Sequence, residues 1–449
     1  KTWRAGRASL IVSIVPLTKR PFASAYVRFP SKTMARERRP DPDRRWRIPP
    51  VPTHTSHSFA GAVLLEELSG PPGLALWQSS RDVQPWSIAP PAERPRLFAP
   101  GAAAARAVAL DDPELKAPVG VLLKMVERPT AIRAEEVAAA CAAVSRWAEA
   151  RGATASALAF AEAAAGASPE DAALAFVAGR LARRRGEYGR AETWLLRAAG
   201  LGRRNGDWES HALAWIGMGK VLIHRGNLGR ARRALLRALR VALRTRRRDL
   251  EGMALHNLFV VETEKGDLRS AEEWAREAFE AYGPGHAELP RLAHDLAHVW
   301  TLEGYFRRAQ AVFRAVLPHF SYPTDRAFLL ANLACASGGA GDRDAFLEAW
   351  SAAWELIEQR GAQAGLSRAL IELARGAAEL GDWERAEHAA SRAVVLATRR
   401  EEVKARAEAE TLLKAFRSRK SPVELAPADN PDGDTLAADI IARLNAIPV

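Results

Sequence analysis

The feature that most constrains this chain is a pattern of Gly, a polar or aromatic pair, and Ala that recurs at nearly constant intervals. The pattern begins at Gly186, Gly226, Gly266, Gly304, Gly341 and Gly381. Successive glycines are 40, 40, 38, 37 and 40 residues apart, and a degenerate copy begins at Gly152. A fixed period of this length is typical of a helical repeat array, in which each unit stacks on the next. Such an array presents a surface rather than a catalytic pocket, so the pattern predicts a binding scaffold.

Residues 210–242 show how one unit is expected to fold. Apolar residues recur there at steps of three and four, which predicts two amphipathic helices. Gly226 divides the two stretches, and glycine suits a turn because it adopts left-handed backbone conformations without strain. The small side chain of Ala231 lets the second helix approach the first closely. The sequence therefore predicts antiparallel helical hairpins, of which at least about three must stack to bury their apolar faces.

The unit around Gly226 resembles the tetratricopeptide repeat (TPR) family. The matching positions, in order, are Trp215, Met218, Gly219, Leu222, Gly226, Ala231, Leu235 and Ala238. The resemblance extends over residues 131–418, although the period is longer than the family's usual unit of about 34 residues and the closing Pro is missing from most repeats. It implies an all-α fold, a right-handed α-α superhelix of TPR-like hairpins, with a concave groove that takes peptide ligands.

Composition agrees with an all-α fold, since the chain is rich in the helix-forming residues Ala, Arg, Leu and Glu. No apolar run approaches the roughly 18 to 20 residues that span a bilayer. The two cysteines, Cys141 and Cys335, lie in different repeats and offer no disulfide framework, which is typical of a reducing compartment. We therefore expect a cytoplasmic protein with no membrane contact and no cofactor, of a kind found in bacteria.

The basic charge is concentrated at the start of the chain. Residues 1–50 hold thirteen Lys and Arg against three acids, so they supply most of the formal net charge of +12. We expect residues 1–58 to form a disordered, Pro-rich tail that contacts nucleic acid only non-specifically. Residues 1–33 are predicted to lie upstream of the natural protein and not to be part of it, because the sequence from Met34 looks more like the start of an ordinary bacterial protein. Residues 59–130 are predicted to be a helical N-terminal cap with a Pro-rich linker, and residues 419–449 a flexible C-terminal tail.

Two histidines, His294 and His298, lie four residues apart on a predicted helix with Asp295 between them. The spacing places both imidazoles on one face and is formally similar to the zinc-peptidase His-Glu-x-x-His arrangement. Asp is shorter than Glu, however, and only His286 is available as a third ligand. We expect a surface or groove face of a repeat helix here and no bound metal; a metallohydrolase is the alternative.

Residues 225–248 contain ten arginines and no acid. Five of them fall on one helical stripe: Arg230, Arg233, Arg237, Arg240 and Arg244. Such a stripe could bind phosphates or acidic protein. The alternative is pairing across the stack with the acids of the following repeat, which are Glu262, Glu264, Asp267, Glu272, Glu273, Glu277 and Glu280.

The TPR resemblance implies that the fifth and ninth positions of each first helix line the groove. Counting back from the turn glycines, the ninth positions are Arg180, Lys220, Val260, His298, Cys335 and Arg375, and the fifth are Phe176, Ile216, His256, His294, Ala331 and Ile371. These twelve positions include cations, imidazoles and apolar residues but no acid. We therefore expect a partner segment with acidic or carboxylate groups and hydrophobic anchors, unless this face is solvated and unused.

The sequence favours a non-enzymatic scaffold or adaptor that holds a protein or peptide. It contains no phosphate-binding Gly loop with Lys and Ser or Thr, and no Gly-x-Ser-x-Gly elbow. A peptide-sensing regulator, with the array as sensor and the basic N-terminus on DNA, is the alternative from another class. Pro71, Pro72 and Pro85 break the helix spacing that a helix-turn-helix would need in residues 59–130.

Overall fold

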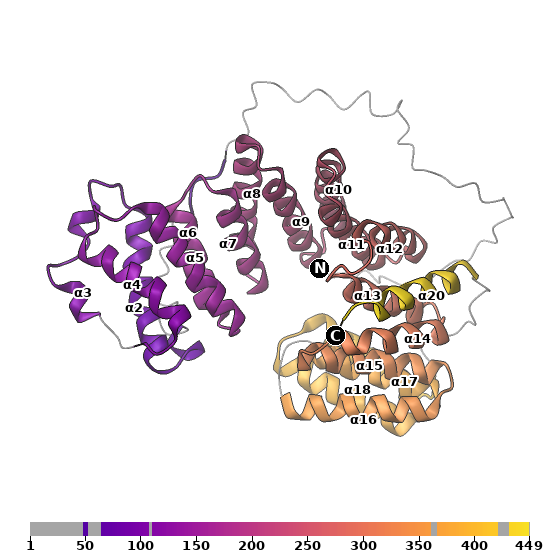
Figure 1. Ribbon diagram of the computed structural model, residues 1–449. Helices are drawn as coiled ribbons and strands as arrows, with labels where there is room; N and C mark the ends of the chain where they lie inside the picture. Colours follow the sequence, from indigo (N-terminus) through magenta and orange to yellow (C-terminus); the bar gives the residue numbers. More distant parts are fainter. Residues whose placement is uncertain (1–47, 53–63, 107–109, 361–365, 421–430, 449) are drawn as a thin grey trace, which may run out of the picture. The chain divides into compact units, whose positions relative to one another are not determined.

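A computed structural model of the chain describes residues 48–52, 64–106, 110–360, 366–420 and 431–448 (Figure 1). Every regular element in these ranges is a helix. None of the described helices combines the length and apolar character needed to cross a bilayer. Residues 1–47, which make up most of the predicted disordered tail, lie outside the described ranges.

Fifteen consecutive helices form the repeat array, and each packs on the next in the chain. They are α5 (Ala134–Ala150), α6 (Thr154–Ala167), α7 (Ala172–Arg184), α8 (Tyr188–Asn205), α9 (Trp208–His224), α10 (Leu228–Thr245), α11 (Arg248–Lys265), α12 (Leu268–Tyr282), α13 (Leu289–Leu302), α14 (Phe306–Val316), α15 (Pro323–Gly339), α16 (Arg343–Arg360), α17 (Leu366–Glu379), α18 (Trp383–Arg399) and α19 (Val403–Arg417). First helices also contact the first helices of neighbouring repeats, as α9 does with α7 and α11. The prediction of an all-α array of TPR-like hairpins is confirmed.

The recurring pattern encodes the turn inside each hairpin. The six turn glycines have φ between 70° and 84°, a left-handed conformation that strains any residue with a Cβ. The polar residue after the glycine then caps the second helix: the side chains of Asn227, Asp267 and Asp382 each accept a hydrogen bond from the backbone N–H three residues on. Asp342 caps α16 in the same way. One short motif thus ends one helix and starts the next.

Small residues set the distance between helices. The motif alanines Ala191, Ala231, Ala271, Ala309 and Ala386 have no exposed surface. The closest contact joins α15 to α17, where a Cβ added at Gly338 would lie 2.1 Å from the carbonyl oxygen of Gly376. A Cβ added at Gly376 would lie 2.7 Å from the Cα of Cys335. These two helices can approach so closely only because both contact positions lack a side chain.

Two longer helices of the N-terminal region pack beside the first hairpin. They are α2 (Gly70–Ile88) and α4 (Pro113–Glu127); the short α3 (Ala102–Ala105) and a 3₁₀ turn (Arg94–Arg96) lie between them in the sequence. Leu76, Val83 and Trp86 of α2 are fully buried, and α2 contacts both α4 and α6. The carboxylate of Glu67 accepts hydrogen bonds from the backbone N–H groups of Ala155 and Ser156, at 2.7 and 3.0 Å. This segment therefore covers the first turn of α6.

Part of the segment predicted as tail is packed on the array. Ile48 and Val51 are partly buried against the main core, and Arg197 Nη1 donates to the carbonyl oxygen of Pro49 at 2.6 Å. The prediction of a disordered tail is therefore wrong for residues 48–52, where partly buried apolar side chains pack against the core. Residues 53–58 lie outside the described ranges.

The prediction of a flexible tail over residues 419–449 is wrong for α20 (Pro431–Asn445). Leu436, Ile440 and Leu444 of this helix are at most 5% exposed, and α20 contacts α13 and α14. Arg443 forms an ion pair with Glu280 at 2.8 Å. The apolar spacing of three and four residues makes α20 amphipathic, and its apolar face is buried on the array.

The α15–α17 contact gives a matched pair of substitutions. Gly376→Ala should lower the free energy of unfolding by roughly 1–3 kcal/mol, because the new methyl group meets the backbone of α15. Gly229→Ala is the control: that position in α10 has nothing within 4 Å and should be neutral or slightly more stable. Urea denaturation followed by circular dichroism measures both. Equal stabilities of the two variants would contradict the close packing.

Candidate functional site

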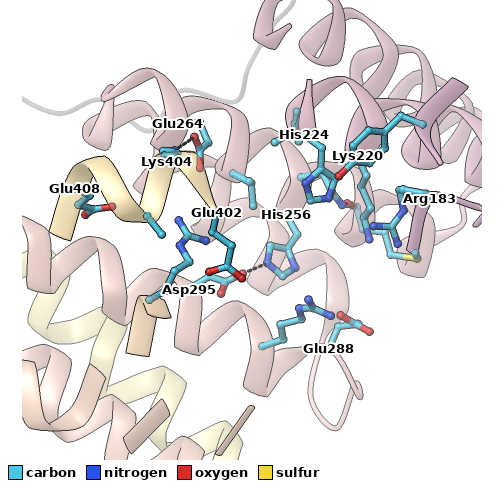
Figure 2. Close-up of a pocket in the computed structure, with 18 of the residues that line it drawn as sticks. Arg183, Lys220, His224, His256, Glu264, Glu288, Asp295, Glu402, Lys404 and Glu408 are labelled. Carbon is cyan, nitrogen blue, oxygen red and sulfur yellow. Dashed lines mark hydrogen bonds and ion pairs between the residues drawn. The ribbon is translucent and has the colours of Figure 1, made fainter. Parts of the chain in front are cut away.

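A cavity of about 1000 Å³ lies between the first helices of the central repeats and the start of α19 (Figure 2). Its wall includes residues of α7, α9, α11 and α13, and it is completed by residues 401–405 and Glu408. Lys404 Nζ in α19 lies 3.2 Å from a carboxylate oxygen of Glu264 in α11, and this ion pair joins the two sides. The cavity is therefore bounded by segments that are 140 residues apart in sequence.

The cavity crosses the helices obliquely. Arg183 lies three residues before its turn glycine, Lys220 six, Asn257 nine and Arg291 thirteen. The lining thus lies in the last turn of α7 and in the first half of α13, whereas in α11 it extends from Met253 to Glu264. The prediction took the same two positions in every repeat and so could identify only part of this wall.

The cationic residues of the wall are Arg183, Lys220, Arg291, Arg368 and Lys404. Burial lowers the pKa of Lys220 to about 8, together with the positive charges of Arg183 and Arg291 and against the negative charges of Glu288 and Asp295. Burial also lowers the pKa of Arg183, with contributions from Arg180, Arg184 and Arg291. Neither Arg183 nor Lys220 forms an ion pair within the described residues. Like charges are thus held close together, and the carboxylates of Glu288 and Asp295 act on Lys220 only from beyond ion-pair distance; Figure 2 shows Arg183 and Lys220 as neighbours.

Carboxylates also line the cavity, and this corrects the expectation of a wall without acids. They come from α11, α13 and the α19 segment, at positions outside the twelve that were predicted. Most already have partners: Glu264 is paired with Lys404, Glu402 accepts from Arg400 at 2.9 Å, and Glu408 accepts from Arg375 at 2.6 Å. Most of the acids are therefore paired within the protein, whereas Arg183 and Lys220 have no ion-pair partner in the described residues.

Apolar and aromatic side chains line the same space. Ile223, Met253 and Val260 are partly buried against the main core and also reach the cavity. Tyr188 stacks on His224, with ring centroids 5.6 Å apart. Burial lowers the pKa of His224, and the charge of Arg183 adds to this effect. The wall therefore combines cations with surfaces that can bind an apolar side chain.

The motif around His294 forms a structural hydrogen-bond network. His256 Nε2 and His294 Nδ1 each donate to a carboxylate oxygen of Asp295 at 3.0 Å, and Asn332 Nδ2 donates to His294 Nε2 at 2.9 Å. Burial alone would raise the pKa of Asp295, but the hydrogen bonds from the two histidines hold it well below its usual range. Both nitrogens of His294 are thus engaged. No three His, Cys, Asp or Glu side chains in the described ranges are arranged to hold a metal ion.

Two of the eight residues proposed for the groove, Lys220 and His256, line the cavity. The other six lie outside its wall: Phe176, Arg180, Ile216, His294, His298 and Arg375. Ile216 is buried in the core. Arg180 binds the Glu149 carboxylate, while Arg375 is held by Glu372 and Glu408. Arg180 and Arg375 are thus engaged in ion pairs, and Ile216 in packing.

The five stripe arginines are all exposed on α10. Their expected pairing with the acids of the next repeat is not made in the described residues, because Glu262 pairs instead with Arg232 on another face of α10, at 3.0 Å. Arg230 lies 3.9 Å from Glu192 in the preceding repeat. The other four, from Arg233 onward, have no carboxylate partner within the described ranges.

The geometry defines the class of protein as a TPR-like helical repeat array with a mixed cationic and apolar cavity. No protein-family model and no curated protein sequence matches the chain. Among solved structures, it is similar to aspartyl phosphate phosphatase F from Bacillus subtilis, with 12% identity over 85% of this chain and 100% of that one and a TM-score of 0.45.

Two further solved structures are also similar. The Rap conjugation gene regulator of plasmid pLS20, in complex with the Phr* peptide, is 14% identical over 82% of this chain and 98% of that one, with a TM-score of 0.45. The TPR2AB domain of yeast Sti1, in a pHSP90 complex, is 18% identical over 62% and 98%, with a TM-score of 0.25. Because these TM-scores are below 0.5, the similarities decide no ligand or activity, and the class rests on the chain's own hairpins.

Lys220 gives a pH-dependent stability prediction. Lys220→Met should raise the free energy of unfolding at pH 7 by about 1 to 3 kcal/mol, since one pKa unit corresponds to about 1.4 kcal/mol and partial exposure weakens the effect. The folded pKa of about 8 lies below the ordinary lysine value, so wild-type stability rises with pH above 8. The difference between variant and wild type should shrink between pH 8 and about 10.4. Urea denaturation across this range measures it, and a pH-independent difference would contradict the assignment.

Proposed function

We propose that this chain is a non-enzymatic protein-interaction scaffold whose cavity binds an anionic segment of a partner protein. The observation that carries the proposal is the pair formed by Arg183 and Lys220, which are close together, partly buried and without an ion-pair partner in the described residues. A bound carboxylate would offset the repulsion between these two cations by forming ion pairs with them.

The apolar lining suggests the remaining chemistry of the segment. Ile223, Met253 and Val260 offer contacts to one or two aliphatic side chains beside the cations. Methionine adapts to different shapes because its side chain is unbranched and polarisable. A segment that alternates acidic and aliphatic residues fits both parts of the wall, and its acids would face Arg183 and Lys220.

The chemistry of the described nucleophiles supports a binding role. Burial raises the pKa of both Cys141 and Cys335, so these thiols stay protonated at neutral pH. His294 uses both ring nitrogens for structural hydrogen bonds. The two cysteines and His294 are therefore in packing or hydrogen-bonding roles, which favours a binding function.

The proposal predicts a charge preference that a peptide panel can measure. Fluorescein-labelled peptides of equal length that pair Leu with Glu, Gln or Lys would be titrated by fluorescence anisotropy. The Glu peptide should bind best, and Arg183→Glu with Lys220→Glu should weaken it at least about tenfold, because each change replaces an attraction by a repulsion. Arg146→Glu with Arg307→Glu is the control, since both residues are exposed and away from the cavity. Equal binding of the three peptides to wild type would contradict the proposal.

Lys220 also predicts how this binding depends on pH. As the pH rises through about 8, Lys220 of the free protein loses its proton, so affinity for the Glu peptide should fall several-fold between pH 7 and 9. In the Lys220→Arg variant the guanidinium stays charged over this range, and the affinity should be nearly constant. The same pH dependence in both proteins would show that Lys220 does not contact the acidic segment.

A further inference from the structure

We propose a second binding site, separate from the cavity, in which single-stranded nucleic acid lies along α10 and stacks one base on Trp208. We define this basic-aromatic surface by Arg203, Trp208, Arg233, Arg237, Arg240 and Arg244. None of the six residues lines the cavity. The ligand class follows from the spacing of the arginines, the exposure of the tryptophan and the lack of carboxylate partners.

The arginines of α10 form an evenly spaced row. From Arg233 to Arg244 they recur at steps of four, three and four residues, so they share one helix face over about 16 Å. All of them are exposed and unpaired with any described carboxylate. A row of guanidinium groups at this spacing can contact successive phosphates, and the planar fork of each group suits a phosphate oxygen pair.

A second helix adds charge to the same surface. Arg203 lies near the end of α8, and its positive charge acts on the imidazole of His211, as do those of Arg237 and Arg244. His211 Nδ1 donates to the carbonyl oxygen of Ala199 at 2.7 Å and leaves Nε2 to accept from Trp215. Burial lowers the pKa of His211, and the three arginines lower it further. Guanidinium groups from two helices therefore lie within electrostatic range of the same imidazole.

An exposed indole lies within this charged area. Trp208, at the start of α9, is 40% exposed, which is unusual for so large an apolar side chain. Its ring lies 5.9 Å from that of His211, in an edge-on arrangement, and 5.8 Å from the guanidinium carbon of Arg244. Arg237 covers the next aromatic ring, that of the buried Trp215, at 4.8 Å. These contacts hold Arg237 and Arg244 against aromatic rings, and Trp208, with Arg244 over one face of its ring, remains 40% exposed.

The combination favours nucleic acid over an acidic protein. Carboxylates need only the cations, whereas unpaired bases also need a flat apolar surface on which to stack. An exposed tryptophan beside a row of arginines supplies both, as in proteins that bind single strands with little sequence preference. The surface reads no base edges, so we expect binding that tolerates sequence and depends strongly on salt.

The test uses the full chain and a fluorescein-labelled oligothymidylate of about 12 nucleotides. The triple variant Arg233→Glu, Arg240→Glu, Arg244→Glu would be compared with Arg146→Glu, Arg307→Glu, Arg343→Glu, which makes the same charge change at exposed arginines of α5, α14 and α16. Both keep the basic residues 1–47. The first variant should bind at least about tenfold more weakly, and the slope of log affinity against log salt should fall by about 2. The control should bind like wild type.

Trp208 gives an independent measurement that does not alter charge. Trp208→Ala should weaken binding about fivefold or more, and Trp208→Phe should restore most of it, because stacking needs a ring rather than an indole N–H. Equal losses in the two triple variants would overturn the proposal in favour of general charge attraction. A different result would favour an acidic protein as the ligand and overturn the proposal: the variant Arg233→Glu, Arg240→Glu, Arg244→Glu loses binding to poly-glutamate but binds oligothymidylate like wild type.

Discussion

The structure depends on one local constraint, which is the left-handed glycine followed by a residue that starts the next helix. With φ near 75° at the glycine, the chain reverses within three residues, and an Asn or Asp side chain then satisfies a free N–H of the second helix. The turn and the cap occur together at Gly226, Gly266, Gly341 and Gly381. First helices of neighbouring repeats contact one another, as α9 does with α7 and α11, and α15 with α17. Burial of the small motif alanines lets each hairpin close.

The cavity follows from this arrangement and from the end of the array. Lining residues come from the last turns of α7 and α9, from most of α11 and from the first half of α13. The segment before α19 and its first residues complete the wall, and Lys404 ties them to Glu264. The protein neutralises most of the acids in this wall and leaves Arg183 and Lys220 unpaired. We propose that this asymmetry gives the cavity a preference for negative charge.

The sequence predicted the hairpins well because their signals are local. Gly226 sets the turn and Ala231 the close packing between two helices that are adjacent in the sequence. Their spacing therefore predicts the hairpin without information on the remainder of the chain. The cavity was only partly predictable. Lys220 and His256 lie at the helix positions that the repeat pattern assigns to the groove. Arg183, Arg291 and Glu264 lie at other positions, which could be identified only once the course of the wall across the helices was known. Lys404 comes from a helix far away in sequence. Nor could sequence alone show that His294 uses both nitrogens within the core, or that α20 packs on α13 and α14.

The central claim is that an anionic segment neutralises the unpaired cations of the cavity, and the protonation of Lys220 reports on this directly. The side-chain carbon and nitrogen signals of Lys220 can be assigned by comparison with the Lys220→Arg variant and followed by NMR as the pH is raised. In the free protein the pKa should be about 8. With a saturating Glu-Leu peptide it should move up toward the ordinary lysine value of about 10.4, because the bound carboxylate favours the charged form. A pKa near 8 that does not change when the peptide binds would contradict the account.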